Sequence, residues 1–211
     1  RIEETLNDPP ALWAEDSTTG KRKALWDPNP QLGRIRFGEA IVYRWKDKTG
    51  YEWTGGLVKP VDYVPGRRYP LVIQTHGFAA SEFITDGVFS TGMAARPLAS
   101  AGFLVLQMSD TFKDHGKLRE PDDYLAGYES AIQQLAADGL ADSHRVGIVG
   151  FSRTCWHVEH ALIEKPDLFA AASINDGIDQ SYMSSMMFDV GRASEAQRLY
   201  GASPWGRDLQ K

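Results

Sequence analysis

The stretch HRVGIVGFSRTCWHVEHALIEKP, residues 144–166, decides how this chain folds. Its first half contains an apolar, β-branched run from Val146 to Val149, which is typical of a buried strand. Its second half has the spacing of a helix that ends before Pro166. Gly150 and Ser152 stand at the junction of the two halves. The pattern therefore predicts a serine at a sharp turn from a strand into a helix.

A serine at such a turn is the nucleophile elbow of α/β-hydrolases. The turn lifts the serine hydroxyl above the sheet, where it meets the positive end of the following helix and free backbone N–H groups. Gly150 supplies the residue without Cβ that the motif requires two positions before the serine. Thr154 stands where the motif usually has glycine, so the match is G-x-S-x-T. We expect this threonine to crowd the contact between the helix and the strand.

The segments around the elbow alternate strands with helices. Apolar runs predict strands at 69–75, 103–106 and 168–174, and helical periodicity predicts a helix at about 122–137. One face of that helix carries Leu125, Tyr128, Ile132 and Leu135. Alternation of this kind implies βαβ units. The expected fold class is α/β, an α/β-hydrolase with a mostly parallel, doubly wound sheet.

The N-terminal part has a different character. Residues 11–16 and 21–26 read as two strands around the turn STTG, and we place a domain boundary near Gly33. The unit 1–33 is too small to be stable alone. The catalytic domain is expected to occupy 34–211 and to begin with an antiparallel hairpin.

That hairpin comprises residues 40–45 and 51–58, whose alternation of apolar and polar residues suits antiparallel strands. With it, the strand count of the catalytic domain reaches about six, whereas an α/β-hydrolase sheet usually has eight. We therefore expect the C-terminal part of the sheet to lie beyond Lys211.

Composition excludes several classes of partner. The chain has 211 residues, 42% of them hydrophobic and 24% charged, which are ordinary globular values. Its net charge of −5 argues against general binding to nucleic acid or to an anionic membrane. No apolar run approaches the roughly 20 residues of a membrane span. The lone Cys155 excludes an internal disulfide and a cysteine-based zinc site. We expect no metal and no cofactor.

The sequence does not provide a complete catalytic triad. In this fold the order along the chain is Ser, then Asp or Glu, then His. After Ser152 the only histidines are His157 and His160, and both lie on the predicted elbow helix. They point along that helix and cannot fold back over the serine, so the base and its acid are expected beyond Lys211. Asp176, after the last predicted strand, is either the acid or a turn residue before a glycine.

These motifs together resemble the prolyl oligopeptidase family of serine peptidases. The resemblance rests on GLVKP at 56–60, RYPLVI at 68–73, the following His-Gly, and LADSHRV at 140–146, and it covers nearly the full length. It implies that residues 1–33 are the last strands of an N-terminal β-propeller. A narrower branch, the lasso peptide isopeptidases, is suggested by GFSRTC at 150–155 and AASINDG at 171–177.

The resemblance assigns roles to individual residues. Ser152 would be the nucleophile, and the backbone N–H of Arg153 would donate to the oxyanion. Thr75 is a possible second oxyanion donor, with His76 or a backbone amide near Phe78 as alternatives. Arg153, His76 and Phe78 would contact the substrate. The Arg153 side chain would either grip the substrate or pair with a nearby acid to hold the loop.

The implied reaction is hydrolysis of the side-chain amide that closes the ring of a lasso peptide. The expected partners are that peptide and the remainder of the same protein. Alternatives are cleavage of linear peptides, as in prolyl oligopeptidases and dipeptidyl peptidases, an esterase with the same triad, and a binding protein on a hydrolase scaffold. The resemblance implies a bacterial protein, cytoplasmic or periplasmic, and the sequence does not decide between these compartments.

Overall fold

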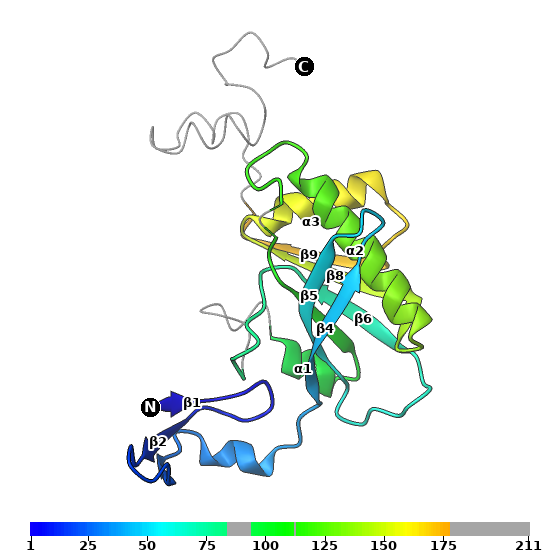
Figure 1. Ribbon diagram of the computed structural model, residues 1–211. Coiled ribbons are helices and arrows are strands. Elements are labelled where there is room, and N and C mark those ends of the chain that lie inside the picture. Colours follow the sequence, from blue (N-terminus) through cyan, green and yellow to red (C-terminus); the bar gives the residue numbers. More distant parts are fainter. Residues whose placement is uncertain (84–93, 112, 178–211) are drawn as a thin grey trace.

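A six-stranded sheet with the strand order β4-β5-β7-β6-β8-β9 forms the centre of the molecule (Figure 1). The computed structural model describes residues 1–83, 94–111 and 113–177. The strands of this sheet are β4 (Ala40–Lys46), β5 (Glu52–Val58), β6 (Tyr69–Gln74), β7 (Leu104–Met108), β8 (Ala141–Phe151) and β9 (Ala171–Asn175). The helices are α1 (Ala95–Ser100), α2 (Glu120–Ala137) and α3 (Thr154–Glu164).

The sheet is mixed. The central β6 pairs in parallel with β7 and β8, and β8 pairs in parallel with β9. The hairpin β4–β5 joins antiparallel to β7. This arrangement confirms the α/β class and each of the six strands that the apolar runs predicted.

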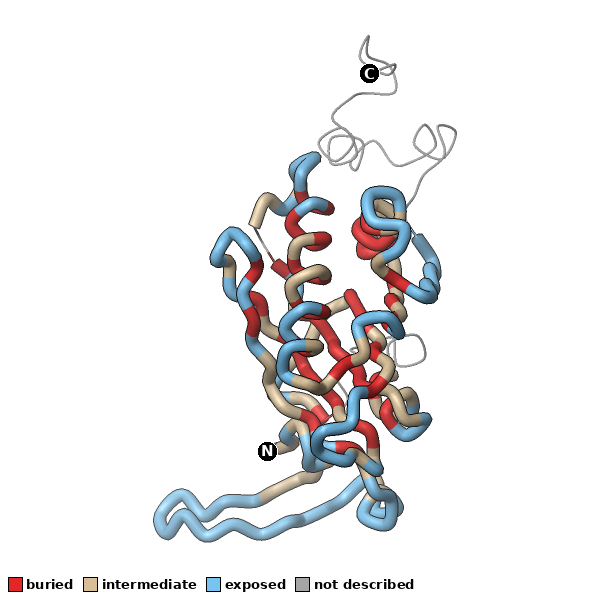
Figure 2. Tube along the Cα trace, turned by 90° about the vertical axis from the view of Figure 1, so that its right-hand side faces the viewer, coloured by how far each residue is buried: buried red, intermediate tan, exposed pale blue. Residues whose placement is uncertain are grey.

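Helices cover both faces of the sheet. On one face α2 and α3 pack against each other and against β8, while α1 packs on β5 and β7 at the other face. Alternation along β7 serves the two faces, because Leu104 and Leu106 belong to the larger core cluster and Val105 to the smaller one under α1. Figure 2 shows the buried positions concentrated in the sheet and its helices.

Two elements extend further than the sequence predicts. The elbow strand, expected over Val146 to Val149, begins at Ala141, which pairs with Tyr69 beyond a register irregularity. Helix α2 begins at Glu120, two residues before the predicted start. In both cases the added residues are mainly polar, and they extend a strand or helix that the apolar residues already define.

The N-terminal unit is a separate three-stranded sheet. The predicted hairpin forms β2 (Ala11–Glu15) and β3 (Arg22–Trp26), and a two-residue strand β1 (Ile2–Glu3) joins it. The short 3₁₀ helix Pro30–Arg34 then leads to the main sheet. The strand β3 is exposed at all five residues, so this sheet has little core of its own.

Candidate active site

Ser152 occupies the strand-to-helix turn that the sequence predicts. Strand β8 ends at Phe151 and α3 begins at Thr154. Ser152 has a φ of 50°, in the left-handed region that L side chains rarely adopt. Its N–H donates to the Asn175 carbonyl over 3.2 Å, and its own carbonyl accepts the Cys155 N–H over 3.1 Å. A backbone strained in this way at a strand-to-helix junction is the geometry of a nucleophile elbow.

Gly150 lets the helix approach the strand. A Cβ at this position would lie 3.1 Å from Val158 Cγ2 and 3.2 Å from Cys155 Cα. The side chain of Cys155 is fully buried beneath the turn, with its Sγ 3.3 Å from the Asn175 carbonyl oxygen.

Thr154 is accommodated by hydrogen bonds where glycine is usual. Its hydroxyl donates to the Phe151 carbonyl over 2.8 Å and accepts the Phe151 N–H over 3.1 Å. It also lies 2.7 Å from the hydroxyl of Thr75. The threonine therefore makes hydrogen bonds in place of the crowding that we expected. These bonds, which we call the Thr154 clamp, close the elbow and link it to the end of β6.

Thr75 uses its hydroxyl in that clamp. The side chain is buried, with 1% of its surface exposed, and its hydroxyl lies within hydrogen-bond distance of both the Thr154 hydroxyl and the Val149 carbonyl. A hydroxyl has one proton to donate. Thr75 therefore supports the elbow from below. For the second oxyanion donor, this geometry favours the alternatives in the segment after Thr75, which are His76 and a backbone amide near Phe78.

That segment, His76 to Phe78, follows β6 beside the elbow. The ring of His76 meets the ring of Phe151 edge-on, with centroids 5.1 Å apart. Gly77 has a φ of 94°, which only glycine adopts readily. The ring of Phe78 lies over Gly56 of β5, where a Cβ would come within 2.3 Å of it.

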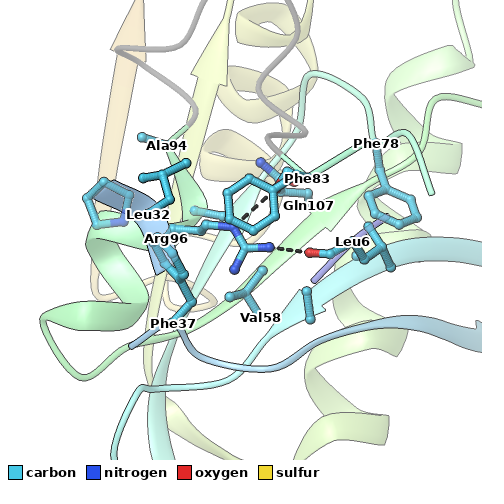
Figure 3. Close-up of a pocket in the computed structure, with 13 residues that line it drawn as sticks. Leu6, Leu32, Phe37, Val58, Phe78, Phe83, Ala94, Arg96 and Gln107 are labelled. Carbon is cyan, nitrogen blue, oxygen red and sulfur yellow. Dashed lines mark hydrogen bonds between the residues drawn. The ribbon is translucent and has the colours of Figure 1, made fainter. Parts of the chain in front are cut away.

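Phe78 also lines a cavity of about 290 Å³ that is mostly apolar (Figure 3). The cavity lies between the N-terminal segment, β5 and α1. Arg96 crosses it between Phe37 and Phe83, with its guanidinium 3.9 Å from the Phe83 ring centroid. This guanidinium donates to the carbonyls of Leu6, Gly38 and Phe83.

The side chain of Arg153 turns to a buried acid. Its guanidinium donates to Glu120 Oε2 over 2.5 Å, and Glu120 has no exposed surface. Glu120 also accepts from the Gly116 N–H over 2.6 Å and faces His157 Nε2 over 3.0 Å. Of the two interpretations offered for Arg153, the structure shows the pairing with an acid.

Charge states follow from this environment. Burial raises the pKa of Glu120, but hydrogen bonds from His157 and the Gly116 N–H, together with the Arg153 charge, outweigh it and lower the pKa to about 2. Burial lowers the pKa of His157, and its bond to Glu120 opposes this only in part. At neutral pH the cluster is thus a carboxylate, a guanidinium and a neutral imidazole.

Sequence reasoning missed Glu120. The available signal was an acid at a helix start, in Arg-Glu-Pro at 119–121. Such acids usually face solvent, and nothing in the local sequence says that this one is buried. Its partners are separated from it by 33 and 37 positions, so only the packing of α2 on α3 reveals the cluster.

The two histidines after the elbow are engaged away from Ser152. His157 stacks on Tyr124, with ring centroids 3.9 Å apart, and bonds Glu120. His160 pairs with Asp122 over 2.9 Å at the surface. Both imidazoles are therefore hydrogen-bonded to carboxylates of α2. In the described ranges 1–83, 94–111 and 113–177, no group of three potential metal ligands is found.

Asp176 follows β9 with a φ of 54°, a conformation that aspartate tolerates in turns, and it is exposed. This agrees with the turn interpretation. Residues 178–211, among them Asp179, Asp189 and the methionines at 183, 186 and 187, lie outside the described residues. None of the helices that the structure describes is long and apolar enough to cross a membrane.

Known proteins are similar to this chain in sequence and in fold. The lasso peptide isopeptidase AtxE2 of Asticcacaulis excentricus is 29% identical over 215 residues, covering 94% of this chain and 30% of that protein. The structure of its serine-to-alanine variant with Astexin3-dC4 bound superposes with a TM-score of 0.75, 28% identity, and coverage of 96% of this chain and 33% of that one. The chain is related to the prolyl oligopeptidase family of serine peptidases.

Further relatives agree. Human dipeptidyl peptidase 8 is 26% identical over 179 residues, which cover 75% of this chain and 19% of that protein. The acylaminoacyl peptidase of Pyrococcus horikoshii has a TM-score of 0.69 at 22% identity, covering 98% of this chain and 34% of that one, and it shows the α/β-hydrolase fold alone. No family model matches the sequence. The chain thus spans less than a third of the curated relatives that it matches, and these relatives are hydrolases of the peptidase class.

Proposed function

We propose that this chain carries the nucleophile of a serine hydrolase that cleaves an amide bond in a peptide. The observation that supports this most strongly is the strained backbone of Ser152 between β8 and α3, with a φ of 50°. Strain of this size costs on the order of 1–3 kcal/mol and is found mostly where function requires it. A serine with a structural role alone would not need it.

The proposed reaction is acyl transfer. Ser152 Oγ attacks the amide carbonyl, the amine leaves, and water then releases the acyl group from the serine. The Arg153 N–H follows the nucleophile and donates to the oxyanion. A main-chain N–H in the segment 76–78 is the proposed second donor, because the Thr75 hydroxyl is engaged with Thr154. The base and its acid partner are proposed to come from other parts of the full-length protein.

The substrate we propose is the isopeptide bond of a lasso peptide. Support comes from the likeness to AtxE2, which covers 94% of this chain, and from the structure of AtxE2 with Astexin3-dC4 bound. His76 and Phe78 are proposed to face the peptide, because both lie in the segment after β6 and His76 contacts Phe151 at the elbow. Residues 1–33 are proposed to be the end of a β-propeller. A preorganised ring loses less conformational entropy on binding than a linear peptide, which favours such a ligand on a large recognition surface.

The test of the nucleophile is Ser152→Ala in the full-length protein. Turnover should fall by about 10⁶-fold, because attack and proton transfer act as a unit, while peptide affinity stays nearly unchanged. Ser143→Ala, at an exposed position of the same strand, is the control and should retain full activity. More than a few per cent of activity in Ser152→Ala would place the nucleophile elsewhere.

The test of the substrate compares three ligands under the same conditions. A threaded lasso peptide, its unthreaded cyclic form and a linear proline-containing peptide are incubated with the protein, and mass spectrometry follows the gain of one water. We expect the threaded form to be cleaved fastest. Cleavage of the linear peptide with the lasso untouched would instead indicate an activity like that of dipeptidyl peptidases. The similarity to dipeptidyl peptidase 8 supports that alternative.

A further inference from the structure

Glu120 joins three segments that surround the elbow. It is the first residue of α2, and its side chain has no exposed surface. Its carboxylate accepts hydrogen bonds from the side chain of Arg153, the neighbour of the nucleophile, and from the Gly116 N–H in the loop before α2. It also faces Nε2 of His157 on α3. One carboxylate therefore ties together the turn, the elbow helix and a loop beside them.

The strength of these contacts depends on charge. A buried carboxylate is favourable only where donors satisfy it, and hydrogen bonds to charged groups are about twice as strong as neutral ones. Arg153 is itself mostly buried, with 22% of its side chain exposed. Removing either charge therefore leaves the other inside the protein without its partner.

The cluster borders a small cavity next to the elbow. The cavity has a volume of about 100 Å³, and its lining includes Arg153, Thr154, His157, Tyr124 and His76. Tyr124 closes one side by stacking on His157. Thr154, whose hydrogen bonds to Phe151 hold the elbow, lines the same cavity as the charged cluster.

We infer that Glu120 is a positioning residue for the nucleophile: through Arg153 it fixes the main chain on which Ser152 and the proposed oxyanion donor lie. This inference rests on the proposed function of Ser152. The backbone at Ser152 is in a strained conformation, which persists only when the surroundings hold it. The side chain of Arg153 joins the partly buried turn of the elbow to Glu120, which is fully buried. Releasing it lets the N–H of Arg153 drift from the place where the oxyanion forms.

The experiment measures the reactivity of Ser152 directly, with a fluorophosphonate probe that labels activated serines in the full-length protein. Glu120→Gln should slow labelling by about 10- to 100-fold per folded molecule, since small misplacements at a reacting centre have effects of this size. The matched control is Asp122→Asn, an acid on the same helix whose partner His160 also lies on α3 but at the surface. This control should label within about twofold of the wild-type rate.

Three further variants separate positioning from simple stabilisation. Arg153→Met should slow labelling to a similar extent, and the double variant Glu120→Gln/Arg153→Met should be no slower than the slower single variant, because the two residues act as one unit. Glu120→Asp keeps the charge and should recover part of the rate. If Glu120→Gln does not fold, Arg153→Met and Glu120→Asp still provide the test.

The outcomes are distinguishable. Labelling of folded Glu120→Gln at the wild-type rate, with only a lower unfolding temperature, would overturn the inference and leave the proposed function intact. Additive effects in the double variant would overturn it as well. Failure of the wild-type protein to label at Ser152 would overturn the proposed function itself, and with it the inference.

Discussion

Adding a single methyl group at Gly150 tests the elbow geometry most sharply. The new Cβ would lie 3.1 Å from Val158 Cγ2, 3.2 Å from Cys155 Cα and 3.3 Å from Val158 Cβ. The side chain of Val158 has some freedom to adjust, but the Cα of Cys155 belongs to the main chain of α3. The first turn of the helix must therefore move away from β8 by a few tenths of an ångström.

Overpacking of this kind costs about 1–3 kcal/mol, so Gly150→Ala should lower the free energy of unfolding by that amount. The displaced helix also carries the turn that holds Ser152, and we expect turnover to fall by about 10-fold or more. Gly147→Ala is the matched control on the same strand. Its Cβ would meet no atom closer than 3.7 Å, and the substitution should leave stability unchanged or raise it by about 0.4–1 kcal/mol.

Urea unfolding followed by tryptophan fluorescence gives the two free energies, and fluorophosphonate labelling gives the reactivity of the serine. Equal stability and equal labelling for the two alanine variants would refute the claim that Gly150 is required by the approach of α3 to β8.

Three other predictions concern the same region. Ser152→Gly and Ser152→Ala should both be inactive, but the glycine variant should be more stable by about 1 kcal/mol in urea unfolding, because only it relieves the left-handed backbone. Thr154→Val should lose about 1–3 kcal/mol in the same assay, since the Phe151 N–H loses a buried acceptor; an unchanged midpoint would contradict the clamp. Stability should fall with acid in two ranges. Below pH 6.5 the unfolded chain protonates His157 more readily than the folded one, and between about 4.5 and about 2 the same holds for Glu120. Unfolding curves at a series of pH values should show both slopes, and Glu120→Gln should make the lower one shallower, the rest coming from acids such as Asp47 and Asp114 whose pKa values are also lowered.

The sequence sufficed for those parts of the fold that depend on local apolar patterns. The strands that end near Thr75, Met108 and Gly150 form where apolar runs predict them, because a strand buried on both faces must be apolar throughout. The two-residue β1 carries no such pattern and was not predicted. Strand order also had to come from the structure, since β7 lies between β5 and β6 although it follows both in the chain.

The candidate site also has one part that local sequence patterns predict and another part that they do not. Ser152 and Gly150 belong to a local motif and were found from five consecutive residues. The hydrogen-bond partners of Arg153 and Thr154 were not found in this way. Glu120 lies 33 positions from Arg153, and Thr75 lies 79 positions from Thr154. Whether a charged side chain is buried depends on what packs over it. Single-sequence reasoning does not provide that information.

The arginine that crosses the large cavity has a mechanical consequence. Arg96 of α1 binds the carbonyls of Leu6 and Gly38, and Asn7 exchanges two hydrogen bonds with the backbone of Ala40. The stretch around Leu6 and Asn7 is therefore hydrogen-bonded to α1 and β4 of the main domain, although the boundary that the sequence predicts lies near Gly33. A swing of the three-stranded sheet would have to bend the chain outside these hydrogen bonds, between β1 and Leu6, near Pro9-Pro10 and in the segment from 27 to 36. The hinge and the domain border would then be different places along the chain.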